Sequence, residues 1–384
     1  MKRPYWWLFG AVILFVLVAV GLRIGRDPNV AVDDASEAPE EVIPGLTLRD
    51  VSLEQQTDEG QLLWKVDAAE VTYSPDQEVA NLIDLEGELY EDGQLLYRVS
   101  ADKGIIRDNG QIILLEDNIT ATGIQNQMVL KGQNLEWTPE DSILIVRNGL
   151  TGVHPQLRAK ANEARIYDSE KRMEFEGDVV ATTIVEDPQV EPWFKLQGET
   201  LQWKWEEETF DSDQELRVER FQNAKVTEVL VGQKSLVELA ENRVTITENV
   251  NAQLLEVPLS LTSDQAVWEI EEQLIQADGS VRVVEPKQQV TVTSQQGTFN
   301  LEEQVARFTQ DVLAIGQRNS SRLTSNSLTW NLEDQTVLAE GNVNYQQLDP
   351  QVKIQGPRAR GRIEEQTVVI DGGQVVTEIV PDVQ

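Results

Sequence analysis

A short motif repeats through most of the chain and constrains the fold more than any other feature of the sequence. An acidic or amide residue is followed by Gly or Asn, or a similar small or polar residue, and an aliphatic residue comes shortly after. Successive copies lie about 30 residues apart. The copies are Glu86–Leu89, Asp117–Ile119, Asn148–Leu150, Glu176–Val179, a degenerate Asn223–Val226, Glu248–Val250, Asp278–Val281, Gln310–Val312, Glu340–Val343 and Asp371–Val375. The spacing breaks between Gly177 and Asn223, where a Pro-bearing insertion, Glu186–Trp193, interrupts the series.

Most copies follow a strand-like run that ends in turn-forming residues. Val71–Gln77 (VTYSPDQ), Leu135–Ser142 (LEWTPEDS) and Leu328–Gln335 (LTWNLEDQ) are examples. Pro, Asp and Asn favour tight turns, and the Gly or Asn of the motif suits a positive φ or a bulge. One unit is therefore predicted to be two or three short strands with a kink. Such a unit cannot bury its own apolar face, but stacked units can.

Alternation with period two runs through these units and predicts strands with one buried face. The apolar set includes Leu62, Trp64 and Val66, then Leu135 and Trp137, Leu201, Trp203 and Trp205, Trp268 and Ile270, and Leu328, Trp330 and Leu332. Neighbouring positions are largely charged or amide. The recurring Trp predicts a ladder of indoles along one line, which is either an ordinary core or in part the lining of a groove.

The N-terminal segment predicts a membrane anchor. Trp6–Leu22 carries no charge and is just long enough to cross a hydrocarbon core of about 30 Å. Lys2 and Arg3 favour a cytoplasmic N-terminus, and Tyr5 to Trp7 suit an interfacial aromatic belt. The anchor candidates are Trp6, Trp7, Leu14, Phe15 and Leu22. A cleaved signal peptide is the alternative, although no clear small-residue cleavage site follows.

Composition excludes several functions. The net charge of −34 disfavours nucleic acid as a partner, and the absence of Cys excludes disulfides and thiol chemistry. The single His, His154, has no second His or Cys with which to bind a metal. Nucleotide-binding and hydrolase motifs are missing, and among 66 acidic residues no catalytic pair stands out. We expect no enzyme activity, no catalytic residue, no metal and no cofactor.

The sequence resembles the lipopolysaccharide-transport family of β-jellyroll proteins, and within it the membrane-anchored LptC, whose fold is shared by the bridge protein LptA or OstA. The resemblance rests on the N-terminal span, on Gly45–Asp76 (GLTLRDVSLEQQTDEGQLLWKVDAAEVTYSPD), and on repeats such as Ala161–Thr182 (ANEARIYDSEKRMEFEGDVVAT) and Ser325–Gln346 (SNSLTWNLEDQTVLAEGNVNYQ). The chain is about twice as long as a usual LptC, so the second half looks like an added LptA-like module.

The predicted fold class is therefore all-β, an elongated β-jellyroll of stacked repeats behind one transmembrane helix. The predicted domains are an anchor at residues 1–25, an acidic Pro- and Ala-containing linker at 26–45, an LptC-like jellyroll at 46–185 and a second OstA-like jellyroll at 186–384.

The resemblance implies a transport component in the inner membrane, with its N-terminus in the cytoplasm and its body in the periplasm. Its partners would be lipopolysaccharide or a related glycolipid, an inner-membrane ABC transporter, and an LptA-like or LptD-like jellyroll at the C-terminal edge. The lipid-groove candidates are Trp64, Val66, Tyr97, Leu135, Trp137, Leu201, Trp203, Trp205, Trp268, Ile270, Leu328, Trp330 and Leu332. The partner-edge candidates are Leu46, Leu48, Val51, Leu53, Val368, Ile370, Val375 and Ile379.

Two other functions fit the same repeats. A membrane-anchored β-solenoid that binds polysaccharide, or that serves as an envelope scaffold, predicts no lipid contact with the inward residues. A β-helical polysaccharide lyase or hydrolase predicts turnover of a polyuronide. The sequence does not distinguish which strand parity would line a groove.

Overall fold

The structure is a computed structural model that describes residues 46–57, 59–348 and 351–379. These residues form 24 strands and one short 3₁₀ turn, Asp108–Gly110. The strands are β1 (Thr47–Gln56), β2 (Leu62–Tyr73), β3 (Val79–Glu91), β4 (Gln94–Arg107), β5 (Ile112–Gly123), β6 (Val129–Thr138), β7 (Ile143–His154), β8 (Leu157–Tyr167), β9 (Arg172–Thr183), β10 (Trp193–Lys204), β11 (Thr209–Ser212), β12 (Leu216–Gln222), β13 (Lys225–Gly232), β14 (Lys234–Glu238), β15 (Arg243–Leu254), β16 (Leu259–Glu269), β17 (Leu274–Glu285), β18 (Val290–Asn300), β19 (Val305–Gly316), β20 (Ser321–Asn331), β21 (Thr336–Leu348), β22 (Gln351–Arg362), β23 (Thr367–Asp371) and β24 (Val376–Ile379).

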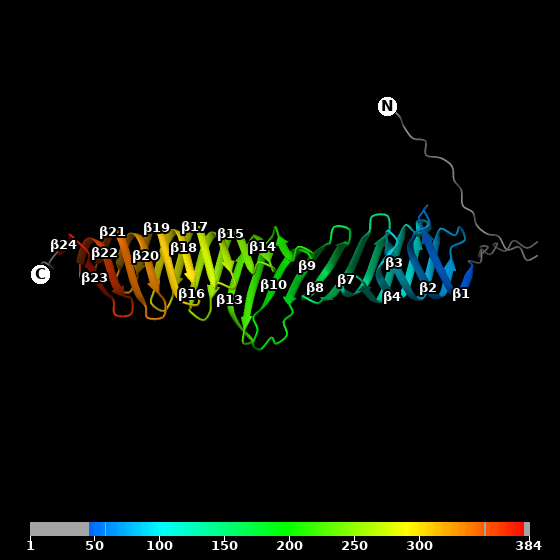
Figure 1. The fold of residues 1–384 in the computed structure, drawn as a ribbon, viewed down its shortest axis with the longest axis horizontal. Coiled ribbons are helices and arrows are strands. Elements are labelled where there is room, and N and C mark those ends of the chain that lie inside the picture. The colour runs from blue at the N-terminus through cyan, green and yellow to red at the C-terminus, as the bar shows by residue number, and fades with distance from the viewer. Residues whose placement is uncertain (1–45, 58, 349–350, 380–384) are drawn as a thin grey trace, which may run out of the picture. The chain divides into compact units, whose positions relative to one another are not determined.

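From β1 to β10 and from β15 to β23, consecutive strands pair antiparallel, so the chain adds strands in sequence order along one continuous sheet (Figure 1). The order is interrupted in the middle. There β10 pairs with both β11 and β12, and β15 pairs with both β13 and β14. Two long strands are thus each replaced by two shorter ones. This split follows the predicted insertion and contains the degenerate copy of the motif, yet the sheet continues through it.

The recurring motif marks a bulge in the middle of a strand. In β7, Asn148 and Gly149 have φ values of 62° and 91°, and in β21 Gly341 and Asn342 have 78° and 50°. Between the pairs Arg147–Glu163 and Leu150–Ala161, two residues of β7 face one residue of β8. The predicted kink is confirmed. The predicted short strands are wrong, because a strand such as β7 runs for 12 residues and carries the kink inside it.

The sheet folds over along this line of bulges. In β16, Leu259, Leu261 and Ser263 are buried before the bulge, and Ala266 and Trp268 are buried after it. The inward faces of the two halves pack on each other: the ring centroids of Phe194 and Trp268 lie 5.9 Å apart, and those of His154 and Trp203 lie 4.8 Å apart. The predicted β-jellyroll fold is therefore confirmed for the described residues.

Small residues let the two halves approach at the fold line. The aliphatic residue of the motif pairs with Gly, Ala or Ser on the next strand, as in Ile119 with Gly132 and Val281 with Ser294. The buried Ser side chains remain satisfied, because the Ser294 hydroxyl donates to the Gln296 carbonyl at 2.8 Å and the Ser325 hydroxyl does the same to Ser327.

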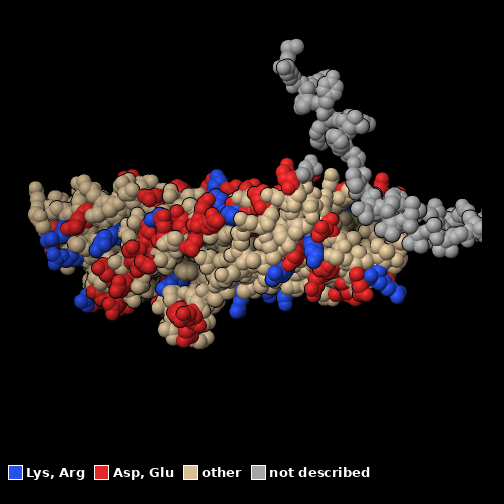
Figure 2. All heavy atoms as spheres, turned by 45° about the vertical axis from the view of Figure 1, so that its right-hand side comes forward, with Lys and Arg blue, Asp and Glu red and all other residues tan. Residues whose placement is uncertain are grey.

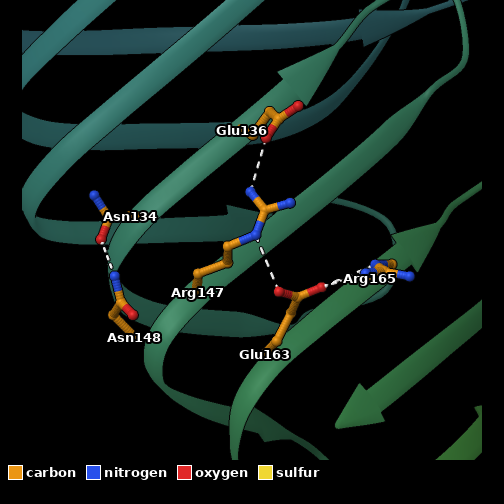
Figure 3. A network of polar contacts seen from close by, with 6 residues as sticks. All are labelled: Asn134, Glu136, Arg147, Asn148, Glu163 and Arg165. Atoms are coloured by element: carbon orange, nitrogen blue, oxygen red, sulfur yellow. Dashed lines mark hydrogen bonds and ion pairs between the residues drawn. The ribbon is translucent and has the colours of Figure 1, made fainter.

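The outward face is polar and is linked across strands by ion pairs. The Arg147 guanidinium on β7 lies 2.7 Å from Glu136 on β6 and 3.0 Å from Glu163 on β8 (Figure 3). Exposed pairs of this kind contribute at most about 1 kcal/mol each. Acidic side chains predominate on the face in Figure 2, so the excess negative charge is carried in solvent and the interior stays apolar.

Residues Pro44–Gln384 form one compact unit. The predicted domain boundary between residues 185 and 186 falls in the β9–β10 connection, and two modules on either side of it remain a prediction. The predicted anchor (1–25) and linker (26–45), with Trp6, Trp7, Leu14, Phe15 and Leu22, lie outside the described residues. Within the described part of the chain, no helix has the length and apolar character needed to cross a membrane.

The bulge glycines offer a test of the fold. A Cβ atom at Gly149 would meet nothing within 4 Å, whereas at Gly341 it would lie 2.5 Å from Nδ2 of Asn326. Gly149→Ala should lower the free energy of unfolding by about 1 kcal/mol, because the left-handed backbone conformation is unfavourable for Ala. Gly341→Ala should cost at least about 1 kcal/mol more, because Asn326 must move. Urea unfolding measures both variants, and equal midpoints for the two would contradict the packing described here.

Candidate functional site

The open side of the jellyroll lies between two rows of turns. The first turn row consists of the turns that come directly after the even-numbered strands from β2 to β10 and from β14 to β22. The second turn row follows the odd-numbered strands from β1 to β9 and from β15 to β21. Contacts join the rows: Gln156, in the second row, donates from Nε2 to Oε1 of Glu208, in the first row, at 2.7 Å. We refer to the line along which the rows meet as the seam.

One row of inward residues runs the length of the sheet beside the first turn row. Through successive pairings it connects Trp137, Trp203, Trp268 and Trp330, with aliphatic, Phe and Met residues between them. The predicted indole ladder is present for these four. Trp64 is different, because it pairs with Leu89 and lies at the other end of its strand. Including Trp64 in this line was wrong, since the alternation restarts at each bulge and period two alone does not reveal in which half a residue lies.

The four indoles of this row share a second property. Their N–H groups are buried and have no hydrogen-bond acceptor among the described residues. Trp64, by contrast, donates to Oε1 of Gln55 at 2.7 Å and to the Gly110 carbonyl at 3.1 Å. A buried donor without an acceptor costs about 1–3 kcal/mol. Trp193, which lies outside the row, also has a buried N–H group without an acceptor, so what distinguishes the four indoles of the row is their alignment.

All the predicted groove residues lie on the inward face of the sheet or pack against the core. Eleven of the 13 are buried, and Trp205 and Ile270 are partly buried. The buried ones are Trp64, Val66, Tyr97, Leu135, Trp137, Leu201, Trp203, Trp268, Leu328, Trp330 and Leu332. Most pack in the closed core, so a role in lipid binding stays a prediction for them.

An apolar cavity opens near the C-terminal end of the sheet. Both inward halves line it, with Val292 and Leu323 on one side and Leu328, Trp330 and Val368 on the other. Only two groove candidates, Leu328 and Trp330, belong to this lining. The sequence analysis missed Val292 and Leu323, although their alternation with polar neighbours in β18 and β20 could have indicated them.

The two ends of the sheet are edges in the described structure. β1 pairs only with β2, and β23 and β24 pair only with β22. Leu46 and Leu48 are exposed near the first edge, while Val51 and Leu53 pack partly against the core. At the second edge Val368 and Ile370 turn inward, and Val375 is exposed. Ile379 belongs to β24. Unpaired edges of this kind can accept another strand.

A polar pocket lies in the middle of the seam, over the apolar interior. Both turn rows line it, through Asn126 and His154 on one side and Asp168, Lys171 and Trp205 on the other. We call it the seam pocket. The hydroxyl of Tyr97 donates to Oδ1 of the buried Asp168 at 3.0 Å, Asn126 donates to the Tyr97 oxygen at 3.0 Å, and Lys171 lies 3.1 Å from Oδ2 of Asp168.

The pKa values of two side chains at the seam pocket, Tyr97 and His154, are shifted. Burial raises the pKa of Tyr97 well above its usual range, and the negative charge of Asp168 raises it further. Burial lowers the pKa of His154, against an opposing effect of Glu208. At neutral pH both side chains are therefore uncharged.

The comparison with protein families now has a structural context. Residues 11–144 match the family described as "Lipopolysaccharide-assembly, LptC-related". The resemblance inferred from the sequence is confirmed for that part of the chain. The match indicates a part in lipopolysaccharide transport, since the LptC family is a component of that system rather than a known enzyme.

No curated protein matches the chain. One similar solved structure is LptH, described as the LptA homologous periplasmic component of the conserved lipopolysaccharide transport device from Pseudomonas aeruginosa. It is 12% identical, with a TM-score of 0.30, and the match covers 33% of this chain and 97% of the LptH chain. A likeness of this size supports no conclusion about function.

The acidity of Tyr97 gives a test of the contacts across the seam. Tyr97→Phe should cost about 1–3 kcal/mol at pH 8, because it removes the hydroxyl that bonds to Asp168. The folded protein keeps Tyr97 protonated above pH 10, where the unfolded chain releases that proton. The wild type therefore loses stability as the pH rises above about 10, and the Phe variant lacks this loss. The difference in the free energy of unfolding between the wild type and the Phe variant, measured by urea unfolding, should be smaller at pH 10.5 than at pH 8. A difference that does not change with pH would contradict the assignment.

Proposed function

We propose that the protein is a membrane-anchored periplasmic component of a glycolipid export machinery. It accepts lipopolysaccharide or a related glycolipid from an inner-membrane ABC transporter and passes it along the inward face toward the outer membrane. The family match over residues 11–144 supports the general role. The observation that carries the rest is one apolar interior, continuous from β2 to β22, beneath a sheet with an edge at each end.

The interior supplies a driving force for holding acyl chains. Burial of each CH₂ group contributes roughly 0.8 kcal/mol, so several chains would bind without any charged contact. The strongly negative chain would repel an anionic head group, so the head group stays outside, in solvent or at the seam. Loading requires that the closed core open along the seam, because most of the inward side chains now fill the interior.

The indole row supports lipid contact rather than simple packing. Trp137, Trp203, Trp268 and Trp330 each hold an unpaired N–H donor at the same register position. Ester, amide or hydroxyl oxygens near the start of acyl chains could accept these hydrogen bonds as the ligand passes. The four indoles along the row would give a moving ligand a series of equivalent binding positions.

The edges supply the means of assembly. A strand from an LptA-like or LptD-like jellyroll would pair with β23 and β24, and the transporter side would engage the end that carries β1. The inner membrane holds the chain through Trp6–Leu22, with the N-terminus in the cytoplasm. The residues after 185 then act as a second module that extends the bridge.

Two neighbouring valines of β23 provide a matched test of lipid passage. Val368 lines the cavity near the C-terminal end, whereas Val369 is 61% exposed on the outward face. A photo-crosslinking amino acid at position 368 should capture lipopolysaccharide in living cells, and the same group at position 369 should not. Equal labelling at the two positions, or none at 368 while 369 is labelled, would overturn the proposal.

A further inference from the structure

The seam pocket has the chemistry of a binding site for hydroxyl groups. Its lining is mainly polar and includes the side-chain amides of Gln125, Asn126, Gln127 and Gln156. An amide offers donors and an acceptor without charge, which matches hydroxyls that both donate and accept. One acceptor is free, because Oε1 of Gln156 is buried and has no hydrogen-bond partner among the described residues.

The charges around the pocket disfavour an anion. Lys171 is the only cation in its lining, and it is already paired with Asp168 at 3.1 Å. His154 is neutral at pH 7, because burial lowers its pKa. Glu206 adds a negative charge to the lining, and Glu208 lies beside it, bound to Gln156. A phosphate would therefore meet carboxylates and no free cation, whereas a sugar would meet amides.

The pocket lies directly over the indole row. His154 meets Trp203 edge to face, with ring centroids 4.8 Å apart, and Trp205 lies 6.0 Å from Trp203. Trp203 is buried in the interior, whereas the partly buried Trp205 belongs to the pocket lining. An amphiphile whose chains enter the interior at this point would place its head group among the amides, with the Trp205 indole available to the apolar face of a sugar ring.

We propose that the seam pocket binds the uncharged, hydroxyl-rich part of the head group of the transported glycolipid. This inference rests on the proposed function and adds a specificity site to it: the interior holds chains without regard to the head group, and the seam pocket selects sugar over phosphate. The site is bounded on one side by the β5–β6 and β7–β8 turns and on the other side by the β8–β9 and β10–β11 turns.

Two amphiphiles with the same chain and different head groups test the site. The full chain in lipid nanodiscs is titrated with diazirine-tagged dodecyl maltoside and with diazirine-tagged dodecyl phosphate, and mass spectrometry follows adducts on the inward residues of β4–β11. The key variant is Gln125→Ala/Gln127→Ala, which removes two exposed amides of one turn. The control is Gln253→Ala, an exposed amide on β15.

The wild type should be labelled by the maltoside at lower concentration than by the phosphate. The double variant should weaken maltoside labelling roughly tenfold and leave phosphate labelling unchanged, as expected for the loss of two neutral hydrogen bonds. Gln253→Ala should behave as the wild type. Partition into the nanodisc differs between the two amphiphiles but is the same for every variant, so it does not affect the comparison between variants.

Other outcomes overturn the inference in distinguishable ways. If both amphiphiles label the interior and the double variant weakens neither or both equally, the seam pocket does not select sugar, while the proposed transport function stands. If neither labels the interior, the proposed function fails with it. If free maltose competes as strongly as the maltoside binds, the pocket serves a free saccharide and the head-group assignment is wrong.

Discussion

The apolar face of a two-stranded unit must be covered from water, and the rest of this structure depends on that constraint. Each unit carries its apolar residues on one side of two long strands, and neither strand can fold back on itself without a break. The bulge supplies the break. Two residues with positive φ in the odd-numbered strand turn the sheet over, so that the two halves of each unit cover one another while neighbouring units extend the same interior.

The features relevant to function follow from this repetition. Because every unit turns at the same place, equivalent residues fall in one register row, and this aligns the four buried indoles. Because the turns all lie on one side, the seam pocket opens between the turn rows, and the apolar cavity opens near the C-terminal end. Because no strand among the described residues closes the stack, β1 and β23–β24 remain as edges. The interior, the seam and the edges are thus consequences of one repeated unit.

Much of this could be predicted from the sequence, since periodicity in sequence becomes periodicity in space. The repeat, the kink residues and the inward parity of residues such as Leu135 and Trp137 were recognisable in that way. The length of the strands and the position of Trp64 could not be recognised in that way. The alternation shifts phase at each bulge, so one long strand looks like two separate strands in a short stretch of sequence. The seam pocket was also hidden. Tyr97 and Asn126 lie close together because their strands are neighbours, but Asp168 comes from a distant unit and reaches them only when the sheet folds over.

The central claim is that acyl chains enter between the two inward faces, and a spin-label scan of β20 tests it most directly. The natural chain has no Cys, so single Cys residues can be introduced from Arg322 to Trp330 and labelled one at a time. Adding lipopolysaccharide should immobilise labels at Leu323, Ser325 and Leu328 and leave Arg322, Thr324 and Thr329 unchanged, with the alternation shifting phase at Asn326. Uniform changes along the strand, or changes confined to the outward positions, would contradict the account.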